Sequence, residues 1–133
     1  MDYGKESIKL HRKYKGKIEI KSKVNLKNKD SLALYYTPGV ASVSEDIFKD
    51  KNKSWELTNR SNQIAIVCDG SAVLGLGNVG PEAGMPVMEG KSVILKEYAG
   101  IDAFPLCINA KETEEIIKLR RLLLYSICRR NQP

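Results

Sequence analysis

The stretch AIVCDGSAVLGLGNVGPEAGMPVMEGK, residues 65–91, is the most informative part of the chain for its fold. It begins as an apolar, strand-like run and then spells Gly75-Leu-Gly77-Asn-Val-Gly80, which matches the GxGxxG pattern of dinucleotide-binding loops. That pattern has its physical meaning only between a strand and a helix, where a tight turn brings the helix N-terminus to a pyrophosphate.

The surroundings of the pattern argue against a dinucleotide-binding loop. Residues 69–73 separate the strand from Gly75, and Pro86 falls where the helix should run. A proline inside a helix costs about 3 kcal/mol because it removes a backbone hydrogen bond. The acidic residue at the expected distance, Glu97, lies in a predicted helix rather than at a strand end. We therefore interpret the stretch as a rigid loop whose glycines allow close backbone approach. A loop that approaches a small substrate is the alternative.

The hydrophobic pattern predicts strands alternating with helices. In the first half of the chain we predict a helix over residues 2–15 ended by Gly16, a weakly paired extended segment over 17–26, a turn at 36–39, a helix over 40–50 and a polar helix or loop over 52–62. In the second half we predict a buried strand over 64–68, a helix that opens after Gly90, a strand over 102–109 containing Pro105, and a helix over 111–128 capped by Thr113. This order predicts an α/β fold with helices around a small, partly parallel sheet.

Length and composition limit the possible classes of protein. The chain of 133 residues is sufficient for one domain. It contains neither a secretory signal nor the apolar run of roughly 20 residues that spans a bilayer, so we expect a cytoplasmic protein without a membrane partner. Cys68, Cys107 and Cys128 are too widely spaced for a disulfide framework or a CxxC zinc site. We expect Cys68 and Cys107 to pack as small buried residues.

The net charge of +6 raises the question of a nucleic-acid partner. The excess of basic residues lies at the two ends of the chain, and near the N-terminus it is mixed with acidic residues. No aromatic and basic signature of a common RNA-binding module is present. A solvated surface is therefore the favoured interpretation, and we expect no nucleic-acid partner.

Three segments together resemble the N-terminal part of a malic enzyme of the shorter, bacterial type. They are LALYYTPGVA at residues 32–41, the stretch at 65–91 and EYAGIDAFPLCIN at 97–109, and the similarity runs in order from about Lys5 to Lys118. The resemblance implies an N-terminal malic-enzyme domain from a parent that oxidatively decarboxylates malate to pyruvate and CO₂. It also implies NAD or NADP, Mg²⁺ or Mn²⁺, and a homo-oligomer, usually a dimer.

The resemblance assigns two catalytic residues. Tyr36, in the segment YTPGV, matches the family's general acid, and the adjacent Tyr35 does not stand directly before Thr-Pro. Lys91, in MPVMEGK, matches the general base. A lysine takes the C2 hydroxyl proton of malate only when neutral, so burial or a nearby cation must lower its pKa. Larger, eukaryotic-type enzymes bind malate with an arginine at the position of Ala72, so that contact must come from elsewhere.

The end of the sequence departs from the family pattern. The family's metal-binding phrase, close to Gly-Gly-Ile-Asn, is not found after Lys118, and no carboxylate follows Glu115. We therefore expect residues 1–118 to be the truncated substrate domain, 119–133 to be an aberrant tail, and the NAD-binding domain to be absent. The sequence accordingly assigns no metal ligand and no cofactor-binding residue, and it predicts an inactive isolated chain.

A frameshift accounts for this tail as a hypothesis. Residues 127–133 can be encoded as ATT TGC AGG AGG AAT CAA CCT, and the same bases read one position later give Phe-Ala-Gly-Gly-Ile-Asn. Two other functions stay open from the sequence: a non-catalytic binding or regulatory domain on the same scaffold and, less favoured, a basic nucleic-acid-binding protein.

Overall fold

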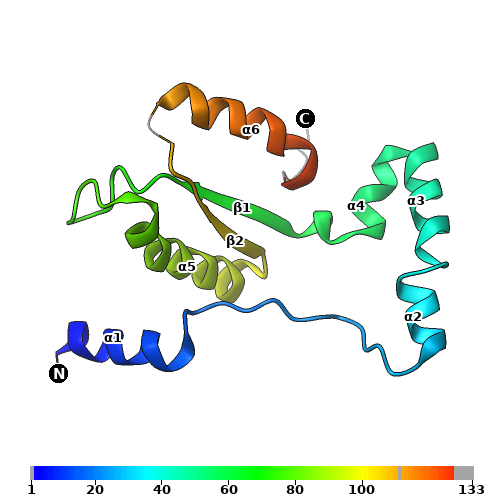
Figure 1. Ribbon diagram of the computed structural model, residues 1–133, viewed down its shortest axis with the longest axis horizontal. Coiled ribbons are helices and arrows are strands. Elements are labelled where there is room, and N and C mark those ends of the chain that lie inside the picture. Colours follow the sequence, from blue (N-terminus) through cyan, green and yellow to red (C-terminus); the bar gives the residue numbers. More distant parts are fainter. Residues whose placement is uncertain (1, 111, 128–133) are drawn as a thin grey trace. The chain divides into compact units, whose positions relative to one another are not determined.

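The computed structural model describes residues 2–110 and 112–127. The chain divides into two compact units. The first comprises Met1–Ile18 and Asn62–Pro133, and the second comprises Glu19–Ser61. Figure 1 labels the helices and strands of both units.

The first unit is built on a strand–helix–strand motif. Strand β1 (Gln63–Cys68) and strand β2 (Asp102–Cys107) are joined through helix α5 (Gly80–Ala99). The strands pair in parallel, with Gln63 opposite Asp102 and Cys68 opposite Cys107. Both predicted strands and the α/β class are confirmed. Pro105 is accommodated because the sheet of the described residues has only two strands, so each strand has an unpaired edge.

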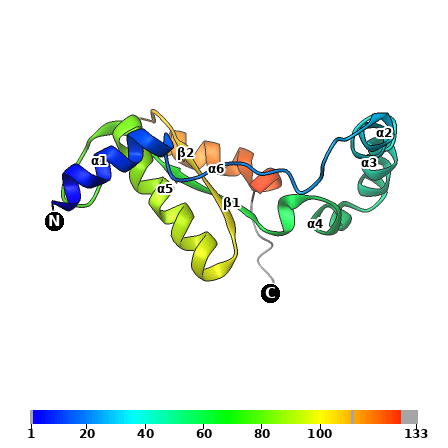
Figure 2. The ribbon, with the colours of Figure 1, turned by 90° about the horizontal axis from the view of Figure 1, so that it is seen from below.

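Helices cover both faces of this small sheet. Figures 1 and 2 show α5 on one face and α6 (Thr113–Ile127) on the other. Among the described residues the buried side chains are few: Val73 and Met88 are each 5% exposed, and Ser92 is 2% exposed. Met88 and Ser92 lie one turn apart on α5, and the Ser92 hydroxyl donates to the Met88 carbonyl at 3.1 Å. The core therefore lies mainly along α5.

The start of α5 corrects the sequence prediction. The helix begins at Gly80, not after Gly90, and contains both Pro81 and Pro86. Pro81 lies in the first turn, where its missing N–H has no intrahelical acceptor to lose. Pro86 removes one bond early in the helix, and packing of α5 against both strands compensates for it. Prolines in the first two turns of α5 are therefore compatible with the helix.

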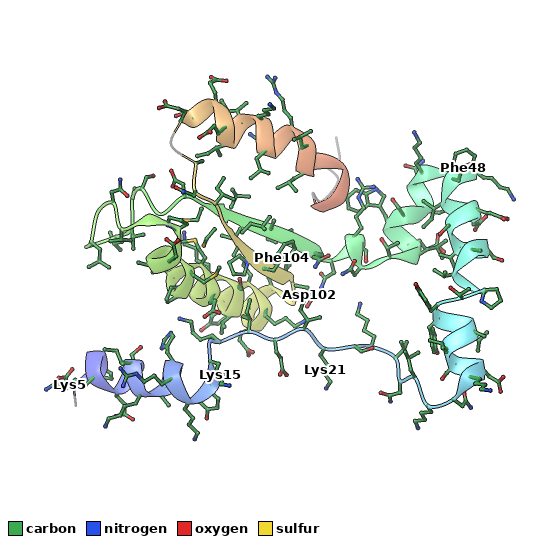
Figure 3. The ribbon with its side chains drawn as sticks, viewed as in Figure 1. Lys5, Lys15, Lys21, Phe48, Asp102 and Phe104 are labelled. Atoms are coloured by element: carbon green, nitrogen blue, oxygen red, sulfur yellow. The ribbon has the colours of Figure 1, made fainter. Side chains whose placement is uncertain are left out.

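Helix α1 (Tyr3–Tyr14) confirms the predicted N-terminal helix. The Asp2 side chain accepts the Lys5 N–H at 3.1 Å, which caps the helix start. The helix ends at Lys15, whose φ of 56° is left-handed, and Gly16 follows with a φ of 111°. Figure 3 labels Lys5 and Lys15 near the two ends of this helix.

The predicted weak pairing over residues 17–26 is wrong for the described chain. The sheet there consists of β1 and β2 alone, and residues 18–22 have no regular structure. The alternation of apolar and polar residues buries nothing here, since Ile20 is fully exposed. Without a buried face, no apolar burial stabilises strand pairing. Lys21 in this segment is labelled in Figure 3.

The second unit is helical. It contains α2 (Lys29–Tyr35), α3 (Val40–Lys49), η1 (Lys51–Lys53), α4 (Ser54–Leu57) and η2 (Asn59–Ser61). The turn at 36–39 and the helix over 40–50 are confirmed, and the 52–62 segment forms short helices. Helix α2 was not predicted, although Asn28 and Ser31 form a capping box at its start.

Side-chain contacts link the helices of the second unit, one between η1 and α3 and another between η2 and α4. The Lys53 ammonium donates to both carboxylate oxygens of Asp46 at 2.8 Å, and Asp46 raises the pKa of Lys53. The Arg60 guanidinium lies 4.3 Å from the centre of the Trp55 ring, a cation–π contact. Phe48 on α3 is 86% exposed (Figure 3).

Helix α6 confirms the predicted C-terminal helix, with one correction at its start. Thr113 is the first helical residue rather than the cap. The Glu115 carboxylate instead accepts the Glu112 backbone N–H at 3.1 Å, as in half of a capping box. The helix runs without a break across residues 118 and 119, and residues 128–133 lie outside the described chain. The division at this boundary therefore stays a prediction. None of the helices in the described part is long and apolar enough to cross a membrane.

Candidate functional site

The loop between β1 and α5 begins with a turn stabilised by Asp69. One Asp69 carboxylate oxygen accepts both the Ser71 N–H, at 3.1 Å, and the Ser71 hydroxyl, at 2.8 Å. These two bonds, the backbone one first, lower the pKa of Asp69 below its ordinary value. An Asp that bonds the backbone two residues on is a common way to fix a turn. The loop thus leaves the strand in a defined direction.

Two glycines bring the ends of this loop together. A Cβ atom added to Gly70 would lie only 1.9 Å from the carbonyl oxygen of Gly80, and the φ of Gly70 is +73°. The Gly70 carbonyl accepts the Val79 N–H at 3.0 Å. Only glycine satisfies both the close approach and the left-handed backbone. The first turn of α5 is therefore held directly against the end of β1.

The GxGxxG spelling forms a small hairpin rather than a tight strand-to-helix turn. Val73 and Gly77 exchange both backbone hydrogen bonds, at 2.8 and 2.9 Å. Gly75, with a φ of +80°, lies at the tip of this hairpin with open space around its Cα. Leu74 and Leu76 are 99% and 69% exposed. A helix does follow, as the dinucleotide pattern requires, but the intervening hairpin replaces the tight turn.

Lys91 lies on α5, about one helical turn after the buried Met88 and directly before the buried Ser92. Its side chain is exposed. Spacing of three and four residues places it on one stripe of the helix with Val87, Ile94 and Tyr98, which are 40%, 57% and 88% exposed. The stripe of these four residues is called the Lys91 stripe below. The predicted base is therefore surrounded on its helix by uncovered apolar surface.

Tyr36 ends helix α2 at the start of the predicted turn. Its backbone N–H donates to the Leu32 carbonyl at 2.9 Å, and its carbonyl accepts the Val40 N–H at 2.8 Å. The side chain is 65% exposed, and that of the neighbouring Tyr35 is 53% exposed. The structure thus fixes the Tyr36 backbone, but exposure alone does not distinguish the two phenols.

Gly39 explains why the turn after Tyr36 is compact. A Cβ atom at this position would lie 2.7 Å from the Ala33 carbonyl oxygen and 2.8 Å from that of Leu34. The Gly39 N–H donates to the Ala33 carbonyl at 2.8 Å. The segment Tyr-Thr-Pro-Gly therefore folds back onto α2, and only glycine leaves room for that contact.

The predicted catalytic residues fall in different units. Tyr36 belongs to the second unit, whereas Lys91 belongs to the first. The loop that contains Asp69 and Ala72 also belongs to the first unit. Within the first unit the loop and Lys91 are linked through α5. A cleft shared by Tyr36 and Lys91 stays a prediction.

A polar network that the sequence did not indicate joins α1 to α5. The Lys17 ammonium donates to the Pro86 carbonyl at 2.6 Å and to His11 Nε2 at 2.8 Å. His11 Nδ1 lies 2.8 Å from the Ser7 carbonyl, to which it donates. Residues of α1 together with Gly16 and Lys17 line a shallow hollow beside this network. Neither Tyr36 nor Lys91 lines that hollow, so it does not extend the predicted site.

The described residues offer no site of the usual kind for a divalent metal. No group of three or more His, Cys, Asp or Glu side chains gathers anywhere in residues 2–110 and 112–127. Asp69, the carboxylate within the loop between β1 and α5, is engaged with Ser71.

Comparison with known proteins places most of the chain in one family. Residues 15–126 match the family model described as malic enzyme, N-terminal domain, and this range includes the glycine loop. The chain is 55% identical over 104 residues to the NAD-dependent malic enzyme of Geobacillus stearothermophilus, covering 78% of this chain and 22% of that protein. It is 48% identical over 123 residues to the bifunctional malic/malolactic enzyme of Bacillus subtilis (strain 168), covering 92% and 30%.

Solved structures show the same similarity. The NAD-dependent malic enzyme of Thermotoga maritima superposes with a TM-score of 0.87 at 45% identity, over 91% of this chain and 34% of that chain. The malic enzyme of Entamoeba histolytica gives a TM-score of 0.87 at 36% identity, over 94% and 27%. The chain thus spans about a third or less of the length of these relatives.

Substitution at Gly70 tests the contact between the loop ends. We expect Gly70→Ala to lower the free energy of unfolding by about 3 kcal/mol or more, because strain and overlap with Gly80 add. The matched control Gly75→Ala meets only the left-handed backbone and is expected to cost about 1–2 kcal/mol. Urea denaturation followed by circular dichroism measures both variants. Equal losses at the two positions would contradict the close approach.

Substitution at Ser71 tests the turn at Asp69. We expect Ser71→Ala to raise the pKa of Asp69 but to leave it below its ordinary value, because the backbone N–H bond remains. Since the folded-state pKa is the lower one, the Asp69 contribution to stability is present above pH 3.8, the ordinary value, and is lost as pH falls through the folded value. Carboxyl-detected NMR titration gives the pKa, and Ser71→Thr, which keeps a hydroxyl, is the control. An unchanged pKa in Ser71→Ala would exclude the hydroxyl bond.

Proposed function

Because this chain belongs to the malic enzyme family through its N-terminal domain, we propose that it provides the acid and base residues of a decarboxylating malate oxidoreductase. The observation that carries the proposal is the family match over residues 15–126, which includes both YTPGV and MPVMEGK. Tyr36 and Lys91 are the residues to which these segments assign chemistry.

Lys91 is proposed to accept the proton of the malate C2 hydroxyl. Loss of that proton lets the C2–H bond transfer its hydride as the carbonyl forms. An amine performs this role only in its neutral form, and desolvation or a nearby cation favours that form. The Lys91 stripe is apolar on both sides of the lysine, so any surface that covers the stripe also removes water from the amine.

Tyr36 is proposed to donate a proton to C3 after CO₂ has left. Decarboxylation leaves an enolate, and protonation of its C3 carbon gives pyruvate. The Tyr36 backbone is bonded on both sides, to Leu32 and to Val40, and Gly39 holds the turn against α2. A fixed backbone limits the positions that the phenol can reach, which favours proton transfer to one carbon.

NAD or NADP and a divalent metal belong to the proposed parent reaction. The relatives include NAD-dependent and NADP-dependent malic enzymes, so the choice of nucleotide stays open. The described residues do not fit either group: they contain no cluster of metal ligands, and the glycine loop forms a hairpin. The homo-oligomer and the cytoplasmic location also belong to this proposal.

The 133 residues alone are expected not to turn over malate. Purified chain is mixed with malate, Mn²⁺ and NAD⁺ or NADP⁺, and reduced nucleotide is followed by its absorbance. We expect no rate above that of the mixture without protein, because hydride transfer needs a bound nucleotide. Turnover of malate by this chain would contradict the prediction that these residues do not bind the nucleotide needed for hydride transfer.

A chimera tests the two catalytic assignments. Residues 15–126 replace the matching segment of the Geobacillus stearothermophilus enzyme, and malate oxidation is measured with and without Lys91→Met. We expect the substitution to lower kcat by about 10²–10⁴-fold, the usual contribution of a general base. Lys96→Met, on the same helix, is the control and should change kcat little.

Tyr36 is tested in the same chimera through the reverse of its proton transfer. An acid that protonates the enolate also catalyses exchange of the pyruvate C3 hydrogens with D₂O. Tyr36→Phe should slow this exchange by at least about tenfold, whereas Tyr35→Phe should leave it nearly unchanged. If Tyr35→Phe caused the larger loss, the assignment would move to the neighbouring phenol.

A further inference from the structure

Three sulfur atoms gather beneath the first turns of α5, outside the proposed catalytic residues. They belong to Cys68 at the end of β1, Cys107 at the end of β2 and Met85 on α5. We propose that Cys68, Cys107 and Met85 form a binding site for a soft monovalent cation, Cu(I). The site is independent of the malate chemistry and uses side chains to which that chemistry assigns no role.

The sheet register brings the two cysteines together. Cys68 and Cys107 are direct partners in the parallel ladder, so their side chains leave the same face of the sheet. That face is the one covered by α5, because a methyl group built on Gly84 of α5 would lie 3.6 Å from Cys68 Sγ. Both thiols are free and partly exposed, which leaves a route for an ion.

Met85 completes the group from the helix side. The Cys107 thiol lies 3.9 Å from Met85 Sδ and is oriented to donate to it. Two sulfurs that share a metal at about 2.3 Å each, with an angle of 120° between them, are about 4.0 Å apart. The Cys107–Met85 separation therefore already fits two ligands of a trigonal metal centre, and the strand register places Cys68 on the same face as the third.

The ligand types select the metal. Thiolate and thioether sulfur together favour Cu(I) over harder divalent ions. Zn²⁺ prefers four ligands and binds thiolate, imidazole or carboxylate rather than thioether. A site of two cysteines and one methionine is thus a poor zinc site and a suitable copper one.

Binding releases protons and leaves negative charge on the site, which the surroundings stabilise at Cys68 but not at Cys107. When Cu⁺ binds, each thiol loses one proton, so the complex carries one negative charge and two protons enter the solvent. The Gly70 N–H points at Cys68 Sγ at 3.2 Å and stabilises negative charge there. Burial, and then the charge of Cys68, raise the pKa of Cys107. Affinity should therefore increase with pH as the protons leave more easily.

The test uses the 133-residue chain with Cys128→Ser, which removes the remaining thiol. Cu(I) is added without oxygen as its acetonitrile complex, in competition with bicinchoninate. We expect one Cu(I) per chain, three sulfur neighbours by X-ray absorption, and protection of Cys68 and Cys107 from alkylation. Absence of stoichiometric Cu(I) binding, or fewer than three sulfur neighbours around the bound metal, would overturn the proposal.

Single substitutions separate the three ligands. Cys68→Ser and Cys107→Ser should each abolish stoichiometric binding, and Met85→Leu, which keeps the volume, should weaken Cu(I) at least tenfold while leaving any Zn²⁺ binding unchanged. Met88→Leu, a buried methionine on the same helix, is the matched control and should bind Cu(I) like the parent. Circular dichroism confirms that each variant is folded. Equal Cu(I) affinity in Met85→Leu and in the parent would remove the thioether from the site and with it the proposal.

Discussion

The close approach of Gly70 to Gly80 is the constraint on which the first unit depends. A parallel pair of strands needs a connection that returns along the sheet, and α5 provides it. Since the end of β1 and the start of α5 lie in backbone contact, the residues between them cannot extend the path and are folded out as a hairpin. The position of every side chain on α5, including Lys91, follows from that contact.

The units bury little apolar surface of their own. Val73 and Met88 are the buried hydrophobic side chains of the described residues, whereas Val87, Ile94 and Tyr98 lie along one stripe of α5 and are exposed. Contiguous exposed apolar surface usually marks a site that another protein surface covers. The base role proposed for Lys91 requires such a covering surface over the Lys91 stripe.

Sequence reasoning succeeded where burial has a simple pattern. The apolar runs that became β1 and β2 could be predicted because both faces of a covered sheet require such residues. The start of α5 could not, because the loss caused by Pro86 is compensated by contacts with distant strands. The catalytic roles of Tyr36 and Lys91 could be predicted only from the family resemblance. Exposure does not distinguish Tyr36 from Tyr35, and Lys91 is an exposed lysine like many others. The pairing of Cys68 with Cys107 was also hidden, because register is a property of the fold.

The exposed position of Lys91 and the exposed apolar stripe around it have one explanation. A lysine becomes a base when water is removed from it or a cation approaches, and neither follows from a side chain that faces solvent. An apolar stripe that faces solvent likewise loses the stabilisation that burial would give it. A single covering surface over Val87, Ile94 and Tyr98 satisfies both requirements at once. The chemistry proposed for Lys91 therefore depends on the same contact that completes the packing of α5.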